Sequence, residues 1–385
     1  MTYARKRLLL GITGVGATVM LCAVSLWFDL PHQFIPATAD DSIASTVAAV
    51  IGAVIVHALL LFGVDVVGGA IVVRESRPLL SWLGAWVRGV VVQLCWFALA
   101  TLVLVRIATS YGHSWAVLAF VFLQLVLVAR QRTIADLAGG VRDVSDGVAV
   151  ASKSALASAA TAAGLPPHTV RLVEGDDPAF VGGWTGFGAP LLIVPRRWAD
   201  QLSGEQLRVV LSRRAAVLSS GLRTRGLLVA VAWNTAGFVL ATSLPNAGLT
   251  SAADFVNTVA WFTIWSFVGV LALPTISRPA VIAADRSAAR LTSTDAVVST
   301  ITALDRLQDD EPERAAGIEA VFHPVPSRAS RVRALSSAET AVGGAGAWHA
   351  TRMMLYLSWA GLGGLSRAVH CNVGRPALWV LLPGD

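Results

Sequence analysis

The sequence contains few charged residues and almost no lysine. Charged residues make up 14% of its 385 residues, whereas soluble globular domains carry about 25%. Only two lysines stand against 28 arginines. The hydrophobic fraction is 55% and the mean hydropathy is +0.65. This composition excludes an ordinary soluble domain and predicts a membrane protein. Arginine-rich cytoplasmic loops explain the net charge of +6, so no nucleic-acid partner is expected.

Cysteine and histidine patterns typical of metal or redox sites are also missing. Cys22, Cys95 and Cys371 lie far apart and form no CxxC pair, which excludes a disulfide framework. None of the seven histidines pairs with another at metal-ligand spacing. A set drawn from His323, His370 and Cys371 is conceivable, but surface histidines and an inert cysteine are the favoured interpretation.

Six apolar segments approach the roughly 20 residues that cross a bilayer. They cover residues 8–28, 46–67, 87–107, 114–129, 226–244 and 255–274. The first follows the basic letters ARKR and lacks a small-residue cleavage site, so we expect a membrane anchor and not a cleaved signal peptide.

The charges of the loops predict the orientation of these spans. Arg5, Lys6 and Arg7 place the N-terminus in the cytoplasm by the positive-inside rule. The loop 29–45 contains three aspartates and neither lysine nor arginine, so it is expected outside. Because the alternation continues through six spans, the two long polar regions should both lie in the cytoplasm and pack as one domain.

The predicted fold class is an α-helical multi-pass membrane protein with about six spans and a cytoplasmic α+β domain carrying a small β-sheet. The predicted organisation is four transmembrane helices in 1–130, the first cytoplasmic part in 131–225, two transmembrane helices in 226–275, the second cytoplasmic part in 276–341, and an amphipathic or re-entrant tail in 342–385. The location is the cell membrane.

Secondary-structure signals in the first polar region follow a definite order. A strand is predicted over 169–175, and a hairpin over 179–195 that turns through GWTGFG. A helix follows over 203–221. Ser203 and Gln206 have the spacing of a capping box, and Gly221 provides a stop signal.

This order, with the letters LSGEQLRVVL, resembles the HtpX-like membrane zinc metallopeptidases, which are related to the CAAX prenyl endopeptidases. Two later blocks are similar to that family: SRPAVIAADRSAARL (277–291) to SRxREYxADxxAA, and ERAAGIEAVFHPVPSRASRVRAL (313–335) to THPPxxxRIxxL. The similarity covers about residues 165–335. It implies a gluzincin-type domain whose helix carries H-E-x-x-H, with two histidine zinc ligands and a glutamate base, and a glutamate as third ligand.

The positions that would carry this chemistry are replaced. The resemblance places the first histidine at Arg213, the glutamate base at Arg214, the second histidine at Val217 and the third ligand at Val281. A guanidinium offers no acceptor and stays protonated, and valine has no donor atom. The motif is therefore degenerate, and no zinc or other cofactor is expected.

Two positions of the family pattern are retained, Asp285 and His323. We expect Asp285 to pair with Arg213 or Arg214, because a buried arginine needs a counter-charge. The alternative is that both arginines point to solvent or lipid headgroups.

The favoured function is a catalytically inactive homologue of a membrane metallopeptidase. Its expected partners are the lipid bilayer and either membrane proteins or an active paralogue. One alternative is an active zinc peptidase with unconventional ligands. Another is an unrelated transporter, which would need polar groups along a path through the spans. The candidates are Asp65, Gln93, Gln124, Asn234 and Asn257, of which Asp65 lies near the cytoplasmic end and is expected to meet water.

Overall fold

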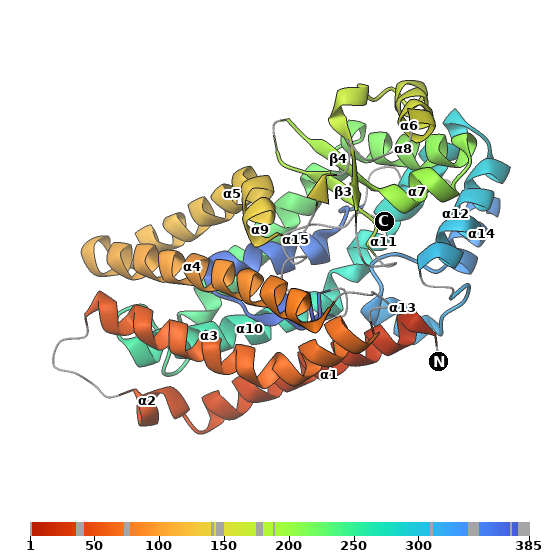
Figure 1. Cartoon of the computed structure of the whole chain (residues 1–385). Helices are drawn as coiled ribbons and strands as arrows, with labels where there is room; N and C mark the ends of the chain where they lie inside the picture. The colour runs from red at the N-terminus through yellow and green to blue at the C-terminus, as the bar shows by residue number, and fades with distance from the viewer. Residues whose placement is uncertain are drawn as a thin grey trace.

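The protein is described by a computed structural model, shown in Figure 1. The structure describes residues 2–35, 42–72, 78–139, 142–143, 150–174, 180–187, 189–308, 311–337, 346–369 and 372–375.

Six helices in the described part of the chain are long and apolar enough to cross a membrane. They are α1 (Tyr3–Trp27), α3 (Ile43–Val66, continued by the π-helical turn η1, Val67–Val72), α4 (Leu79–Tyr111), α5 (His113–Ala138), α9 (Leu222–Ala241) and α10 (Ala252–Ala272). The six predicted spans fall on these helices in the same order. A short helix, α2 (Leu30–Phe34), follows α1.

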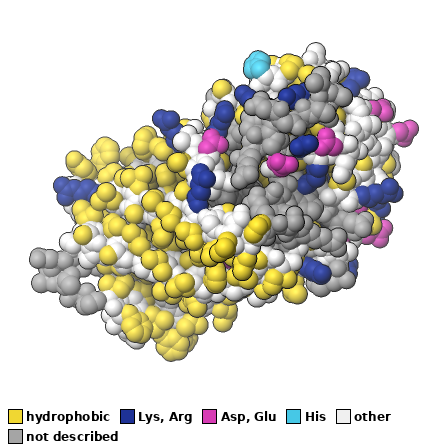
Figure 2. Space-filling model, viewed as in Figure 1, with side chains coloured by type: hydrophobic (Ala, Val, Ile, Leu, Met, Phe, Trp, Pro, Cys, Tyr) yellow, Lys and Arg dark blue, Asp and Glu magenta, His cyan; other side chains and the backbone are white. Residues whose placement is uncertain are grey.

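The outer surface of these helices is apolar. Met20, Leu59, Phe122 and Leu228 are each more than 60% exposed. Figure 2 shows hydrophobic side chains gathered over the long helices, while most charged side chains lie at the opposite end of the molecule. Large apolar surface of this kind marks a membrane-facing or partner-facing region. Together with the helix lengths, it supports location in a membrane.

The first polar region forms a four-stranded sheet of order β1-β2-β4-β3. The strands are β1 (Arg142–Asp143), β2 (Val170–Glu174), β3 (Gly183–Thr185) and β4 (Leu191–Pro195). Strands β2 and β4 are parallel, and the other two pairs are antiparallel. The predicted hairpin is confirmed as β3–β4. Gly182 precedes it with φ +64°, and a Cβ there would lie 2.1 Å from the Ile193 carbonyl oxygen, so only glycine fits.

Helices surround this sheet and join the two polar regions. The first region contributes α6 (Val150–Ala162), the 3₁₀ turn η3 (Pro167–Thr169), α7 (Arg196–Gln201) and α8 (Gly204–Ser219). The second contributes α11 (Pro274–Leu291), α12 (Thr294–Gln308), α13 (Ala316–Phe322) and α14 (Arg328–Ser336). Leu304 of α12 shares a hydrophobic core with Trp198 and Leu211. The two regions therefore pack against each other, as the sequence predicted.

The tail packs inside the helical bundle. It forms α15 (Ala350–Leu357) and the 3₁₀ turns η4 (Ser358–Gly361) and η5 (Leu365–Arg367), and α15 lies beside α9 and α10 in Figure 1. The Tyr356 hydroxyl donates to the Leu127 carbonyl at 2.8 Å, and Trp359 packs edge-on against Phe97. The side chains of α15 are buried on nearly every face of the helix. The placement of the tail as an amphipathic or re-entrant segment stays a prediction.

Asp65 does not meet water, which corrects the expectation from its position near a span end. The residue is 2% exposed. Its carboxylate accepts hydrogen bonds from Arg367 of the tail, from the Trp86 indole at 2.9 Å and from the Gly374 backbone N–H at 2.8 Å. A buried carboxylate needs such partners, and here the C-terminal segment supplies two of them.

Candidate functional site

The site is built on α8, whose ends are set by local sequence. The Ser203 hydroxyl accepts from the Gln206 N–H at 3.2 Å, and the Gln206 side chain accepts from the Ser203 N–H at 3.0 Å. This is the predicted capping box. Gly221 follows the helix in the left-handed conformation, with φ +69°. These two signals fix α8 and so fix which residues face the interior.

Arg213 and Arg214 lie on the buried side of α8, each only 1% exposed. The expectation that they point to solvent or headgroups is therefore wrong. A charged side chain is rarely buried so completely unless it is paired. The partners of these two arginines therefore determine which chemistry is available at this site.

Asp285 of α11 is the counter-charge of Arg213, one of the two arginines expected to pair with it. The Arg213 Nε lies 2.5 Å from Asp285 Oδ1. Arg331 of α14 donates to the same carboxylate through Nε and Nη2, both at 2.8 Å. The carboxylate, itself 1% exposed, is thus held between two guanidinium groups from different helices. Such charge-assisted hydrogen bonds are the strong ones.

Arg214 connects α8 to the β3–β4 hairpin. Its Nη2 donates to the Val181 carbonyl at 3.3 Å, and its own carbonyl accepts from the Trp184 indole at 2.9 Å. Arg214, the residue that the sequence resemblance matched to a general base, therefore holds the neighbouring strand in position. As a permanent cation, it has no lone pair to accept a proton from water.

Val217 and Val281 meet in one apolar cluster. Val217 follows Arg213 by four residues and Val281 precedes Asp285 by four, so each pair shares one face of its helix. Both valines pack with Trp348 from the segment before α15. The Trp348 N–H donates to the Leu222 carbonyl at 3.1 Å. A Cβ on Gly226 would lie 2.0 Å from the Trp348 carbonyl oxygen, so this glycine permits the close approach.

The residues at these positions do not fit a zinc ion. Zinc sites need three or four Cys, His or carboxylate ligands. The four matched positions provide two guanidinium groups and two apolar side chains, and the nearby carboxylate of Asp285 is occupied by arginine. Within the described residues, no three His, Cys, Asp or Glu side chains lie close enough together to hold a metal ion. His370 and Cys371 lie outside the described residues.

His323 follows α13 and lines a cavity of about 130 Å³. This cavity adjoins Asp285, Arg213 and Arg331, which we call the Asp285 cluster. Burial, and to a lesser extent the nearby Arg314 guanidinium, lower the pKa of His323 to about 4. The imidazole is therefore neutral at pH 7. Arg213 and Arg331, which bind Asp285, line the same cavity as His323.

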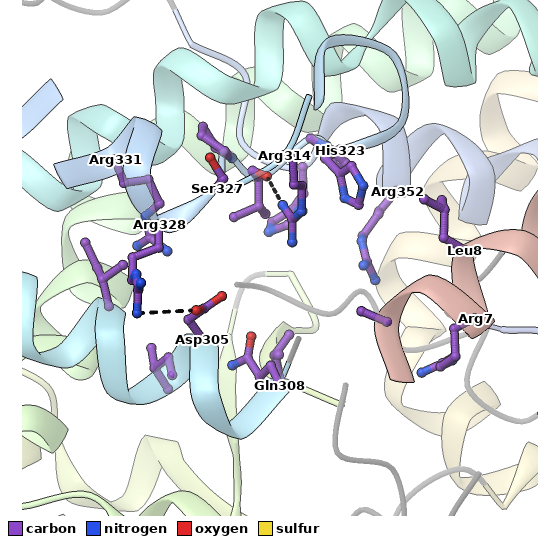
Figure 3. Close-up of a pocket in the computed structure, with 18 of the residues that line it drawn as sticks. Arg7, Leu8, Asp305, Gln308, Arg314, His323, Ser327, Arg328, Arg331 and Arg352 are labelled. Carbon is purple, nitrogen blue, oxygen red and sulfur yellow. Dashed lines mark hydrogen bonds and ion pairs between the residues drawn. The ribbon is translucent and has the colours of Figure 1, made fainter. Parts of the chain in front are cut away.

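Arginine dominates the wall of this cavity, which we call the arginine cavity. In Figure 3, Arg328 and Arg331 lie on one side, Arg7 on the other, and Arg314 between them. The lining arginines are Arg7, Arg213, Arg314, Arg328, Arg331 and Arg352.

Sequence reasoning missed three residues of this site. Arg331 lies within the third matched block, but nothing in the sequence separates it from Arg328 or Arg333. Trp348 and Arg352 precede and open α15, outside all matched blocks. Their roles depend on how the tail folds back onto α8 and α11, for which the sequence carries no local signal.

The comparisons with known proteins support the fold. No protein-family model and no curated protein matches the chain. Among solved structures, the chain is similar to Ste24p from S. mikatae, with a TM-score of 0.65 and 13% sequence identity over 82% of this chain and 83% of that one. The chain thus has a fold like that of Ste24p. At this identity, the likeness describes the fold alone.

Proposed function

We propose that the protein is a catalytically inactive homologue of a membrane metallopeptidase, with a binding or regulatory role at the membrane. One observation carries the proposal. The carboxylate beside the place of a zinc site is held by two arginines, Arg213 Nε at 2.5 Å and Arg331 at 2.8 Å. Where a peptidase needs ligands and a base, this chain has an ion-pair cluster and an apolar contact.

The arrangement suits a structural role of these residues. The ion-pair cluster of Asp285, Arg213 and Arg331 joins α8, α11 and α14, and Trp348 joins the tail to α8 and α11. A buried ion pair specifies geometry more than it adds stability. The retained scaffold would therefore present a fixed surface to lipids and to membrane proteins, such as an active paralogue. The arginine-rich loops favour the cytoplasmic side for this surface.

The transporter alternative receives less support. Three of its candidate path residues form hydrogen bonds between distant parts of the chain, whereas the side-chain amide of the buried Gln93 has no hydrogen-bond partner among the described residues. Gln124 donates to Thr235 at 3.2 Å, and Asn234 donates to the Met354 carbonyl at 3.1 Å. Asn257 donates to Asp29 at 2.9 Å. These bonds tie helices to one another and to the loop after α1.

A peptidase assay tests the proposal. The purified full-length protein, reconstituted in liposomes, is incubated with an unfolded protein substrate, with and without added zinc. An active membrane zinc metallopeptidase serves as the positive control. We expect to observe no zinc-dependent hydrolysis, that is, none that is lost when a zinc chelator is added. Chelator-sensitive hydrolysis that survives repurification would overturn the proposal in favour of unconventional ligands.

A further inference from the structure

A second, apolar groove of about 230 Å³ adjoins the arginine cavity. We call it the α1 groove. Its walls come from α1 and α10, and α15 contributes to its lining. Its lining includes Leu8, Ile12, Val15, Phe267, Val270 and Leu355. Almost all of its exposed surface is apolar, in contrast to the neighbouring cavity.

The two spaces meet at three residues. Leu8, Pro324 and Arg352 line both the arginine cavity and the α1 groove. Figure 3 shows Leu8 and Arg352 side by side at one end of the cavity. The Arg352 Nη1 is buried and has no hydrogen-bond partner among the described residues. A buried guanidinium nitrogen without an acceptor is costly, so a ligand oxygen at this junction would stabilise it.

The wall of the arginine cavity is mainly basic. Six arginines line it, whereas Asp305 is the only acidic side chain among the described residues of its lining. Asp285 binds Arg213 and Arg331, and Asp305 lies 3.7 Å from Arg328. The buried Nη1 of Arg352 has no hydrogen-bond partner among the described residues. Guanidinium groups suit phosphate oxygens in particular, and an enclosed site strengthens the attraction.

The position of the α1 groove indicates that the ligand also has an apolar part. Ile12, which lines it, is 43% exposed, and the neighbouring Leu9 is 55% exposed. Both lie on a helix long and apolar enough to cross a membrane. The groove thus opens on the apolar outer surface, where acyl chains would lie. A soluble anion would fill the cavity and leave the groove uncovered.

We propose that the arginine cavity and the α1 groove form one binding site for an anionic phospholipid, with the phosphate headgroup among the arginines and an acyl chain in the groove. Arg352 contacts the phosphate at the junction. This inference deepens the proposed binding role by naming the ligand class.

Lipid binding to the delipidated full-length protein tests the proposal. Native mass spectrometry compares phosphatidylglycerol with phosphatidylcholine of the same acyl chains, and with glycerol 3-phosphate as the chain-free anion. We expect preferential retention of phosphatidylglycerol. The Arg352→Gln variant should bind it about tenfold to a hundredfold more weakly, the effect of losing a charged hydrogen bond. Arg132→Gln, an exposed arginine outside both spaces, should bind it like the wild type.

The groove is tested by a matched pair of substitutions on α1. Ile12→Trp fills the groove and should weaken binding of phosphatidylglycerol, whereas Leu9→Trp places the same side chain on the neighbouring exposed face and should not. The thermal stability of both variants is measured in detergent to detect a folding defect. If Ile12→Trp is destabilised, Val15→Leu is tested in its place.

Three outcomes overturn the proposal: equal retention of the two phospholipids, binding of glycerol 3-phosphate as tight as that of the lipid, or unchanged binding in Arg352→Gln. The result is separate from the proposed loss of catalysis. A protein that hydrolyses peptides with zinc and still selects phosphatidylglycerol refutes only the proposed function. One that is inactive without lipid selectivity refutes only this inference.

Discussion

Replacing Asp285 by asparagine should destabilise the protein strongly, although the two side chains have nearly the same shape. The carboxylate is 1% exposed and is the acceptor for Arg213 and Arg331. Asparagine removes the negative charge and turns one acceptor into an N–H donor that faces guanidinium donors. Two buried cations then repel each other. Breaking a buried ion pair in this way costs about 3–5 kcal/mol.

Thermal unfolding of the solubilised protein, followed by tryptophan fluorescence, measures the loss. Globular proteins unfold with about 2.1 cal/mol/K of entropy per residue, which gives about 0.8 kcal/mol/K for 385 residues. The expected fall in Tm is therefore about 4–6 °C. Adding Arg213→Met to Asp285→Asn should restore part of this, because one of the two buried cations is removed.

The control is Asp200→Asn, the same substitution at an exposed aspartate of α7. Asp200 lies 3.5 Å from Arg196 in a solvent-accessible pair, and such pairs contribute about 0–1 kcal/mol. Its Tm should change by about 1 °C or less. If the Tm of Asp285→Asn also lies within about 1 °C of the wild-type Tm, the ion pairs of Asp285 do not hold the helices together.

Three further predictions concern the outer loop, the apolar cluster and the tail. A hydrogen bond to Asp29 raises the pKa of His32. The stabilisation that protonated His32 provides is complete below about pH 6.5 and is lost as the pH rises through the raised pKa. The fall in Tm from pH 5.5 to 8.5 should therefore be smaller in His32→Gln than in the wild type, and an equal fall in both proteins would contradict this. Trp348→Ala should lose about 3–5 kcal/mol, seen as a Tm lower by about 4–6 °C; a change below 1 °C would show that the indole is not needed to fill the cluster. Arg367→Met leaves the Asp65 carboxylate buried without its counter-charge and should lower Tm more than the double variant with Asp65→Asn does; equal losses would refute the pairing.

The spans and α8 could be predicted because their signals are local. Hydropathy over about 20 residues identifies a membrane helix, and Ser203, Gln206 and Gly221 fix the ends of α8 within its own sequence. A pairing of Asp285 with Arg213 or Arg214 followed from chemistry, since a buried guanidinium needs a carboxylate, but the sequence did not distinguish between the two arginines. Each of these inferences used residues near one another in sequence or in a matched pattern.

The remaining features depend on contacts between distant parts of the chain. Arg367 and Asp65 are 302 positions apart, and no local sequence pattern predicts that the tail inserts among the helices. Trp348 reaches Val217 and Val281 only after that insertion. The choice of Arg331 among several nearby arginines is made by the packing of α14 on α11, which composition does not encode.

We propose that the ion-pair cluster of Arg213, Asp285 and Arg331 occupies the place where the sequence resemblance implies a zinc site. The most direct measurement is the zinc content of the purified full-length protein, by inductively coupled plasma mass spectrometry, after saturation with zinc and removal of unbound metal. We expect zinc far below one ion per chain, with no change in Asp285→Asn. One zinc per chain that resists desalting and is removed by a chelator would contradict it.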